Sequence, residues 1–65
     1  MIDEEYLHWH DGVELDAATQ LWRGYIEDND YTRKVLTDET FRKKGDAVIA
    51  AGKMLAAARH GNPPA

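Results

Sequence analysis

Few side chains in this sequence are of the kinds that carry out catalysis. The 65 residues include no cysteine and no serine, so the commonest nucleophiles are missing. The four threonines suit helix caps or surface positions better than a catalytic triad. The five glycines stand singly, so no phosphate-binding loop is present. We therefore expect a protein that is not an enzyme and uses no cofactor.

The sequence His8-Trp9-His10 is the one arrangement that invites a metal ion. Neutral imidazole is a common ligand, and Asp11 follows directly. Residues two apart on a helix do not face each other, however, so the two rings would converge only in an extended segment. We expect surface histidines on either side of a buried tryptophan, and no metal site.

Charge is distributed unevenly along the chain. Residues 1–32 carry nine acids and one base, a net charge of −8, whereas residues 33–65 carry seven bases and three acids, a net charge of +4. Such asymmetry can mark a binding partner of opposite charge. The plainer interpretation, which we favour, is that the two halves pack against each other or against a second copy of the chain.

Two alternatives involve nucleic acid. Five of the eight bases lie between residues 33 and 44 and could contact phosphates, although a calculated pI near 5.1 is unusual for a nucleic-acid binder. This possible surface for an anionic partner consists of Arg33, Lys34, Arg42, Lys43 and Lys44. Conversely, the acidic first half could imitate a phosphate backbone and occupy a nucleic-acid-binding protein.

The periodicity of apolar residues predicts helices only. A short helix is expected over residues 4–11, with Asp3 as its cap, Ile2 and Leu7 as a hydrophobic staple, and Gly12 as its end. A second helix is expected over 17–28 after Asp16, because its apolar residues follow the spacing 0, 3, 4, 7, 8. One or two helical turns are expected over 31–36.

The longest predicted helix begins at Thr37 or Asp38 and ends near residue 60, before Gly61. Its apolar and small residues form a heptad-like seam in which the glycines would let another backbone approach closely. The residues of this helix-packing or dimer seam are Phe41, Gly45, Val48, Ile49, Gly52, Leu55 and Ala56. An alternative parse ends one helix at Gly45 and begins another at Asp46.

The sequence thus predicts an all-α domain of three or four helices over residues 1–61, with a disordered tail over 62–65. A chain this short without cysteine has neither disulfides nor a thiolate zinc site to stabilise it, so we expect a homodimer. No membrane-spanning run or export signal is evident, which indicates the cytoplasm. The expected function is that of a protein–protein interaction module, such as a small adaptor, regulator or inhibitor of a bacterial or phage accessory type, with no small-molecule substrate.

Overall fold

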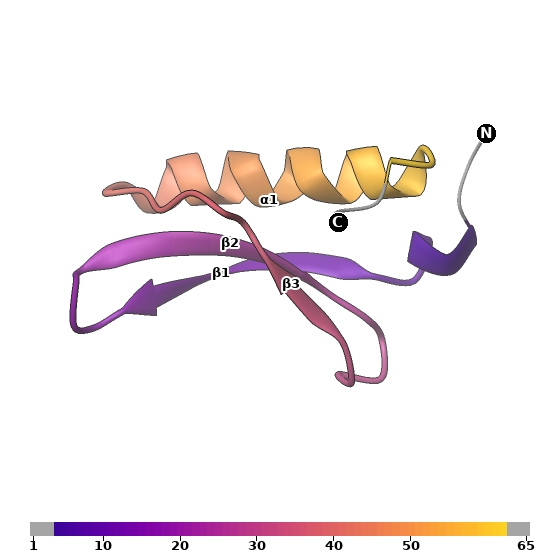
Figure 1. Ribbon diagram of the computed structural model, residues 1–65, viewed down its shortest axis with the longest axis horizontal. Helices are drawn as coiled ribbons and strands as arrows, with labels where there is room; N and C mark the ends of the chain where they lie inside the picture. Colours follow the sequence, from indigo (N-terminus) through magenta and orange to yellow (C-terminus); the bar gives the residue numbers. More distant parts are fainter. Residues whose placement is uncertain (1–3, 63–65) are drawn as a thin grey trace.

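The computed structural model describes residues 4–62, and its architecture is α+β (Figure 1). A 3-10 turn η1 (Glu4–Tyr6) leads into three strands, β1 (His10–Asp16), β2 (Leu21–Glu27) and β3 (Lys34–Leu36), and the chain ends in a helix α1 (Lys44–Arg59). The strands form one antiparallel sheet in the order β1-β2-β3. The prediction of an all-α domain is therefore wrong.

The helix predicted over 17–28 is strand β2. Its register with β1 pairs Val13 with Gly24, and alternate residues of β2 point to opposite faces of the sheet. Trp22 and Ile26 face α1, while Leu21 and Tyr25 face the uncovered side. The apolar pairs Leu21-Trp22 and Tyr25-Ile26 are four residues apart, which is also the spacing of the apolar stripe of a helix. The apolar periodicity therefore predicted a helix where the chain forms a strand.

Acidic side chains hold the turns that join the strands, and one of them, Asp16, was predicted to cap a helix. Asp16 ends β1, and its carboxylate accepts the Ala18 N–H at 2.9 Å in the connection to β2. Asp28 is buried in the connection to β3 and accepts the N–H groups of Thr32 and Arg33 at 2.8 and 3.1 Å. Short acidic side chains compete for backbone donors in turns as readily as at helix starts.

Helix α1 begins at Lys44, so the expected start at Thr37 or Asp38 is wrong and Gly45 lies inside the first turn. The chain before it is extended, and Phe41 forms a β-bridge with Trp22 through two hydrogen bonds of 2.6 and 2.7 Å. The expected end is confirmed. Gly61 has a positive φ of 86°, and the N–H of Asn62 bonds the carbonyl of Ala57 in a Schellman arrangement.

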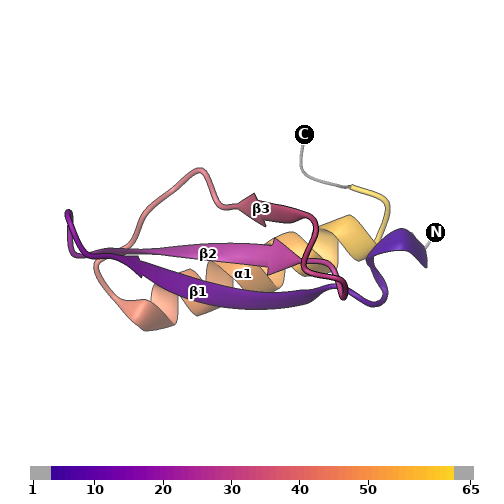
Figure 2. The same ribbon diagram turned by 90° about the horizontal axis from the view of Figure 1, so that it is seen from below.

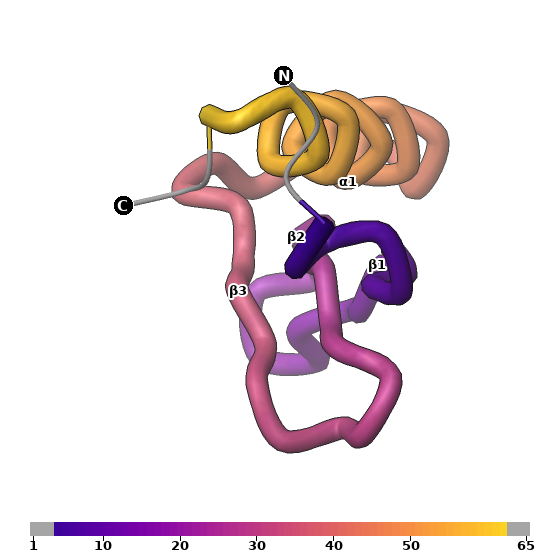
Figure 3. The backbone as a smooth tube through the Cα atoms, turned by 90° about the vertical axis from the view of Figure 1, so that its right-hand side faces the viewer, coloured from indigo at the N-terminus to yellow at the C-terminus, as the bar shows by residue number. Residues whose placement is uncertain are grey.

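The core lies between the sheet and α1, and α1 covers one face of the sheet only (Figure 3). Its centre is Trp9, Ile26, Leu55 and Ala58. The buried alanines of α1 let it lie close to β2, because a Cβ on Gly24 would be 2.7 Å from the Ala47 carbonyl oxygen. A glycine in the strand and alanines in the helix therefore set the distance between the two layers.

The N-terminal segment is tied to the end of α1 by one side chain. The Arg59 guanidinium donates to the carbonyl oxygens of Tyr6, Leu7 and Trp9 at 3.1, 3.4 and 2.9 Å. The predicted first helix over 4–11 is thus a single 3-10 turn followed by the start of β1. Its predicted cap and staple partner, Asp3 and Ile2, and the tail residues 63–65 lie outside the described residues.

Candidate interaction surface

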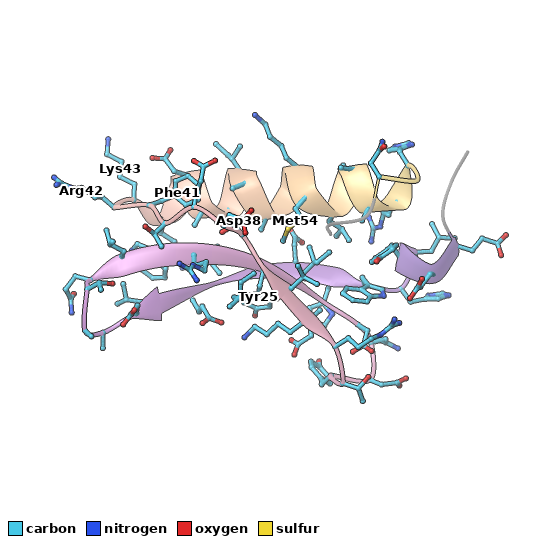
Figure 4. All side chains as sticks on the ribbon, in the orientation of Figure 1. Tyr25, Asp38, Phe41, Arg42, Lys43 and Met54 are labelled. Atoms are coloured by element: carbon cyan, nitrogen blue, oxygen red, sulfur yellow. The ribbon has the colours of Figure 1, made fainter. Side chains whose placement is uncertain are left out.

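The side chains with predicted roles do not lie together on one surface. Figure 4 shows that Arg42 and Lys43 extend away from the molecule at the start of α1, whereas Met54 and Asp38 lie at the side of β3.

The predicted seam is divided by the fold. Leu55 is buried against the sheet, and Phe41 lies before the helix. The remaining members lie on the surface of α1 that is not buried against the sheet. Gly52 lies on its β1 side, next to Asp11, and Ile49 lies on the other side, where it lines a hollow with Phe41 and Ala50. We call this set the outer flank; it consists of Gly45, Val48, Ile49, Gly52 and Ala56.

The outer flank exposes more apolar surface than the rest of α1. Val48 is 47% exposed and Ile49 is 58% exposed, while Gly45 has no atom within 4 Å of the place where a Cβ would be. The nearest atom to a Cβ on Gly52 would be the Asp11 carboxylate at 3.7 Å, which is ordinary contact. The small residues of the flank are therefore not required by packing within the chain.

The predicted basic surface is also divided. Lys34 pairs with Glu27 at one end of β2, and Phe41 bridges Trp22 at the other end, so the basic stretch spans about 17 Å of strand. The stretch is thus split into Arg33 and Lys34 at one end and three bases at the start of α1 at the other. Those bases are Arg42, Lys43 and Lys44.

Arg33 and Lys34 are engaged within the chain. The Arg33 guanidinium donates a hydrogen bond to the Glu5 carboxylate and lies 5.1 Å from the centre of the Trp9 ring, and this hydrogen bond raises the pKa of Arg33. The Lys34 ammonium lies 2.6 Å from the Glu14 carboxylate and 4.3 Å above the Tyr25 ring. The hydrogen bond that Lys34 donates to Glu14 raises the pKa of the lysine. These two bases are therefore already engaged by side chains of the same chain.

The bases at the start of α1 have no carboxylate partner among residues 4–62. Lys43 caps α1 in an extended conformation without a side-chain bond to the first turn, and Lys44 lies 5.6 Å above the Trp22 ring. Three cations at a helix N-terminus oppose the helix dipole, which favours negative charge there. An external anion would relieve that opposition.

The two histidines that could have suggested a metal ion lie in different surroundings, since His8 precedes β1 and His10 is its first residue. Trp9 is buried in the core, as expected, and His8 is exposed. His10 begins β1 on the uncovered face, 3.5 Å from the Glu27 carboxylate and edge-on to Tyr31 at 5.4 Å. Within the described part of the chain, no group of three His, Asp or Glu side chains could hold a metal ion.

The uncovered face of the sheet was not anticipated, because the sequence analysis predicted no strand. Tyr25 lies across Gly12, where a Cβ would come within 2.5 Å of the tyrosine ring. Beside it, a hollow of about 320 Å³ is lined by apolar and charged residues. Its lining consists of Glu14, Leu15, Asp16, Ala17, Leu21, Arg23, Leu36 and Thr40.

Edge strand β1 is the other feature that the sequence reasoning missed. Gly24 exchanges bonds with Thr37 on the β3 side: its N–H donates to Oγ1 at 3.2 Å and its carbonyl accepts the Thr37 N–H at 2.9 Å. Its partner Val13 therefore belongs to a pair without hydrogen bonds between β1 and β2. By the same alternation, the N–H and C=O groups of Asp11, Val13 and Leu15 point outward from the sheet.

Comparison of the chain with protein-family models, curated proteins and solved structures found no match. No helix within residues 4–62 is long and apolar enough to cross a bilayer.

Proposed function

We propose that this chain is a non-enzymatic protein–protein interaction module that acts as a homodimer and, in that form, binds another protein. The observation that carries the proposal is the outer flank of α1. It combines two large exposed apolar side chains, Val48 and Ile49, with small residues that packing within the monomer does not require. Clustered apolar exposure of this kind is typical of a surface that another chain covers.

The charge distribution supports self-association. The acids of the first half lie mainly on the strands and turns, and three bases of the second half that have no ion pair among residues 4–62 lie together at the start of α1. Two copies in antiparallel orientation would bring these regions near each other. The uncovered sheet face, with the hollow beside Leu21 and Leu36, remains free for the second protein.

The test is the solution mass of the wild type and of Gly52→Leu, measured by light scattering over a hundredfold range of concentration. We expect a wild-type dimer and a folded, monomeric variant, because a leucine at position 52 has room in the monomer but would obstruct the flank. Ala57→Leu is the matched control, since Ala57 is exposed on the opposite flank and should leave the mass unchanged. A wild type that stays monomeric at every concentration refutes the homodimer.

A second candidate function is binding to nucleic acid through Arg42, Lys43 and Lys44, which lack ion-pair partners among the described residues. Each phosphate contact that forms would make the affinity fall with added salt. Mutating Lys43 and Lys44 to Gln should then abolish the mobility shift of duplex DNA at low salt. A wild type that gives no shift at low salt removes this candidate.

Acidic mimicry by the first half has less support. Several of its carboxylates are engaged inside the chain, and their ability to imitate phosphates is reduced accordingly. The engaged acids are Glu5 with Arg33, Glu14 with Lys34, Glu27 with His10, and Asp28 with its own turn. A partner affinity that does not change with salt would exclude this mechanism.

A further inference from the structure

The free edge of β1 is the longest unpaired backbone surface in the described chain. β1 is seven residues long and lies at the edge of the sheet, with only β2 beside it. Asp11, Val13 and Leu15 turn their N–H and C=O groups outward, and none of these six groups has another partner among residues 4–62. An exposed edge of this length is a template for strand addition.

We infer that β1 pairs with β1 of a second copy, antiparallel and centred on Val13, to make a continuous six-stranded sheet with both helices on one face. This inference rests on the proposed homodimer and specifies how it is built. A two-fold axis perpendicular to the sheet requires one residue of β1 to face its own copy. Each residue of β1 is therefore a possible centre of the pairing, which is the residue that lies on the two-fold axis.

Charge repulsion eliminates most centres. Centring on Asp11 or Glu14 would set a carboxylate directly against its own copy, and centring on Leu15 would set Glu14 against Asp16 of the partner. Like charges directly opposite are destabilising. Centring on Gly12 or on Val13 places no carboxylate opposite another.

Hydrogen bonding separates the two remaining centres. Centring on Val13 pairs all seven residues of β1, and the outward groups of Asp11, Val13 and Leu15 form six bonds across the interface. Centring on Gly12 pairs only five residues of the strand and forms four. The Val13 register also sets His10 opposite Asp16 of the other copy, and Glu14 opposite Gly12.

The helices fit this arrangement. At the level of Val13, α1 lies over Gly24, and the start of α1 projects past β1 on the side away from β3 (Figure 2). With strands about 4.8 Å apart, the two helix axes would run antiparallel roughly 10–14 Å apart, and the lower end of that range is a packed pair. Val48 and Gly52 lie on the facing flanks.

The dimer also joins opposite charges. Asp11 would lie opposite Leu15 of the second copy. Leu15 pairs with Trp22, and Lys44 lies over the Trp22 ring. Each Asp11 carboxylate would therefore be level with the basic start of the other copy's α1. Negative charge near a helix N-terminus is favourable, so the two contacts stabilise the pairing in this orientation.

The experiment begins with Val13→Pro. Because the Val13 N–H points outward, proline removes no bond between β1 and β2 but removes two of the six interface donors. We expect the variant to keep the wild-type circular dichroism and its dimer dissociation constant to rise about 10- to 100-fold. Val13→Ala, which keeps the N–H, is the matched control and should remain dimeric.

Disulfide trapping tests directly which residues of the two β1 strands face each other, and it does not require the Val13→Pro variant to fold. The chain has no cysteine of its own. In the Val13 register, residue 10 faces residue 16 of the other copy with Cα atoms about 4.5 Å apart, within reach of a disulfide. A mixture of His10→Cys and Asp16→Cys should cross-link under mild oxidation, whereas each variant alone should not, since identical positions would be about 20 Å apart.

The outcomes separate the two proposals. A monomeric wild type overturns both the homodimer and the strand pairing. A wild-type dimer that Val13→Pro does not weaken, and that the 10/16 mixture does not cross-link, overturns the strand pairing alone. Cross-linking of His10→Cys with Glu14→Cys in place of Asp16→Cys would overturn the register, because it reports the Gly12 centre.

Discussion

Replacing Gly24 with alanine tests the closest contact between the two layers. Gly24 lies in the middle of β2 directly beneath α1. A Cβ added there would be 2.7 Å from the Ala47 carbonyl oxygen and 2.9 Å from the Ala51 Cβ. Neither atom belongs to a flexible side chain that could turn aside, so α1 itself would have to move.

The size of the effect follows from that movement. Restoring a contact of 3.4 Å requires α1 to retreat by about 0.7 Å, which loosens the packing of Ile26 against Leu55 and Ala58. Overpacking of this kind costs about 1–3 kcal/mol. Alanine in a strand recovers about 0.5–1 kcal/mol of backbone entropy relative to glycine. The free energy of unfolding should therefore fall by about 1–2 kcal/mol, and Tm by roughly 5–15 °C.

The assay is thermal unfolding followed by circular dichroism, repeated at two protein concentrations a hundredfold apart so that association is accounted for. Gly45→Ala is the matched control, because nothing lies within 4 Å of its Cβ position and alanine favours a helix. It should raise stability by up to about 1 kcal/mol. A Gly24→Ala protein as stable as the wild type would refute the close seating of α1 on β2.

Two further predictions concern the turn and the N-terminal tie. The Thr32 hydroxyl, followed by the N–H groups of Arg33 and Thr32, lowers the pKa of Asp28 from 3.8 to about 2, so this carboxylate contributes stability above pH 4 that is lost as the pH falls towards 2. Asp28→Asn should be less stable at pH 7 and show a flatter loss between pH 4 and 2, as urea unfolding at several pH values would reveal; an unchanged acid profile would contradict this. Arg59→Gln should lower the free energy of unfolding by about 1–3 kcal/mol, because three carbonyls lose a charged donor, whereas the exposed Lys53→Gln should change it by less than about 0.5 kcal/mol in the same urea titration. Equal effects of the two substitutions would show that Arg59 does not hold the N-terminal segment.

The error in fold class can be traced to particular residues. In β2, the pairs Leu21-Trp22 and Tyr25-Ile26 place one apolar side chain on each face of the sheet at two levels. A spacing of four between such pairs is the same as that of an amphipathic helix, so periodicity alone cannot separate the two structures. Gly24 and the aromatic residues around it favour a strand, and these were the signals that could have corrected the assignment.

Some residues of the candidate surfaces were singled out by the sequence, and their role in binding stays a prediction. Val48, Ile49 and the glycines of α1 were identified as a helix-packing face, and the outer flank does carry most of them. The free edge of β1 could not be found without a sheet. Arg33 and Lys34 were grouped with Arg42, Lys43 and Lys44 because they are close in sequence, but the extended chain between them carries the two groups to opposite ends of β2.

The sequence by itself determined the local features that depend on a few neighbouring residues. These are the end of α1 at Gly61, where a left-handed residue is needed, and the turn at Asp28-Asn29-Asp30. Only the tertiary structure decided the rest. Whether Leu21–Glu27 became helix or strand depended on the bonds that β1 and β3 offered it and on the alanine face of α1, and those interactions join residues far apart in the chain. The choice therefore belonged to long-range pairing, which local periodicity does not contain.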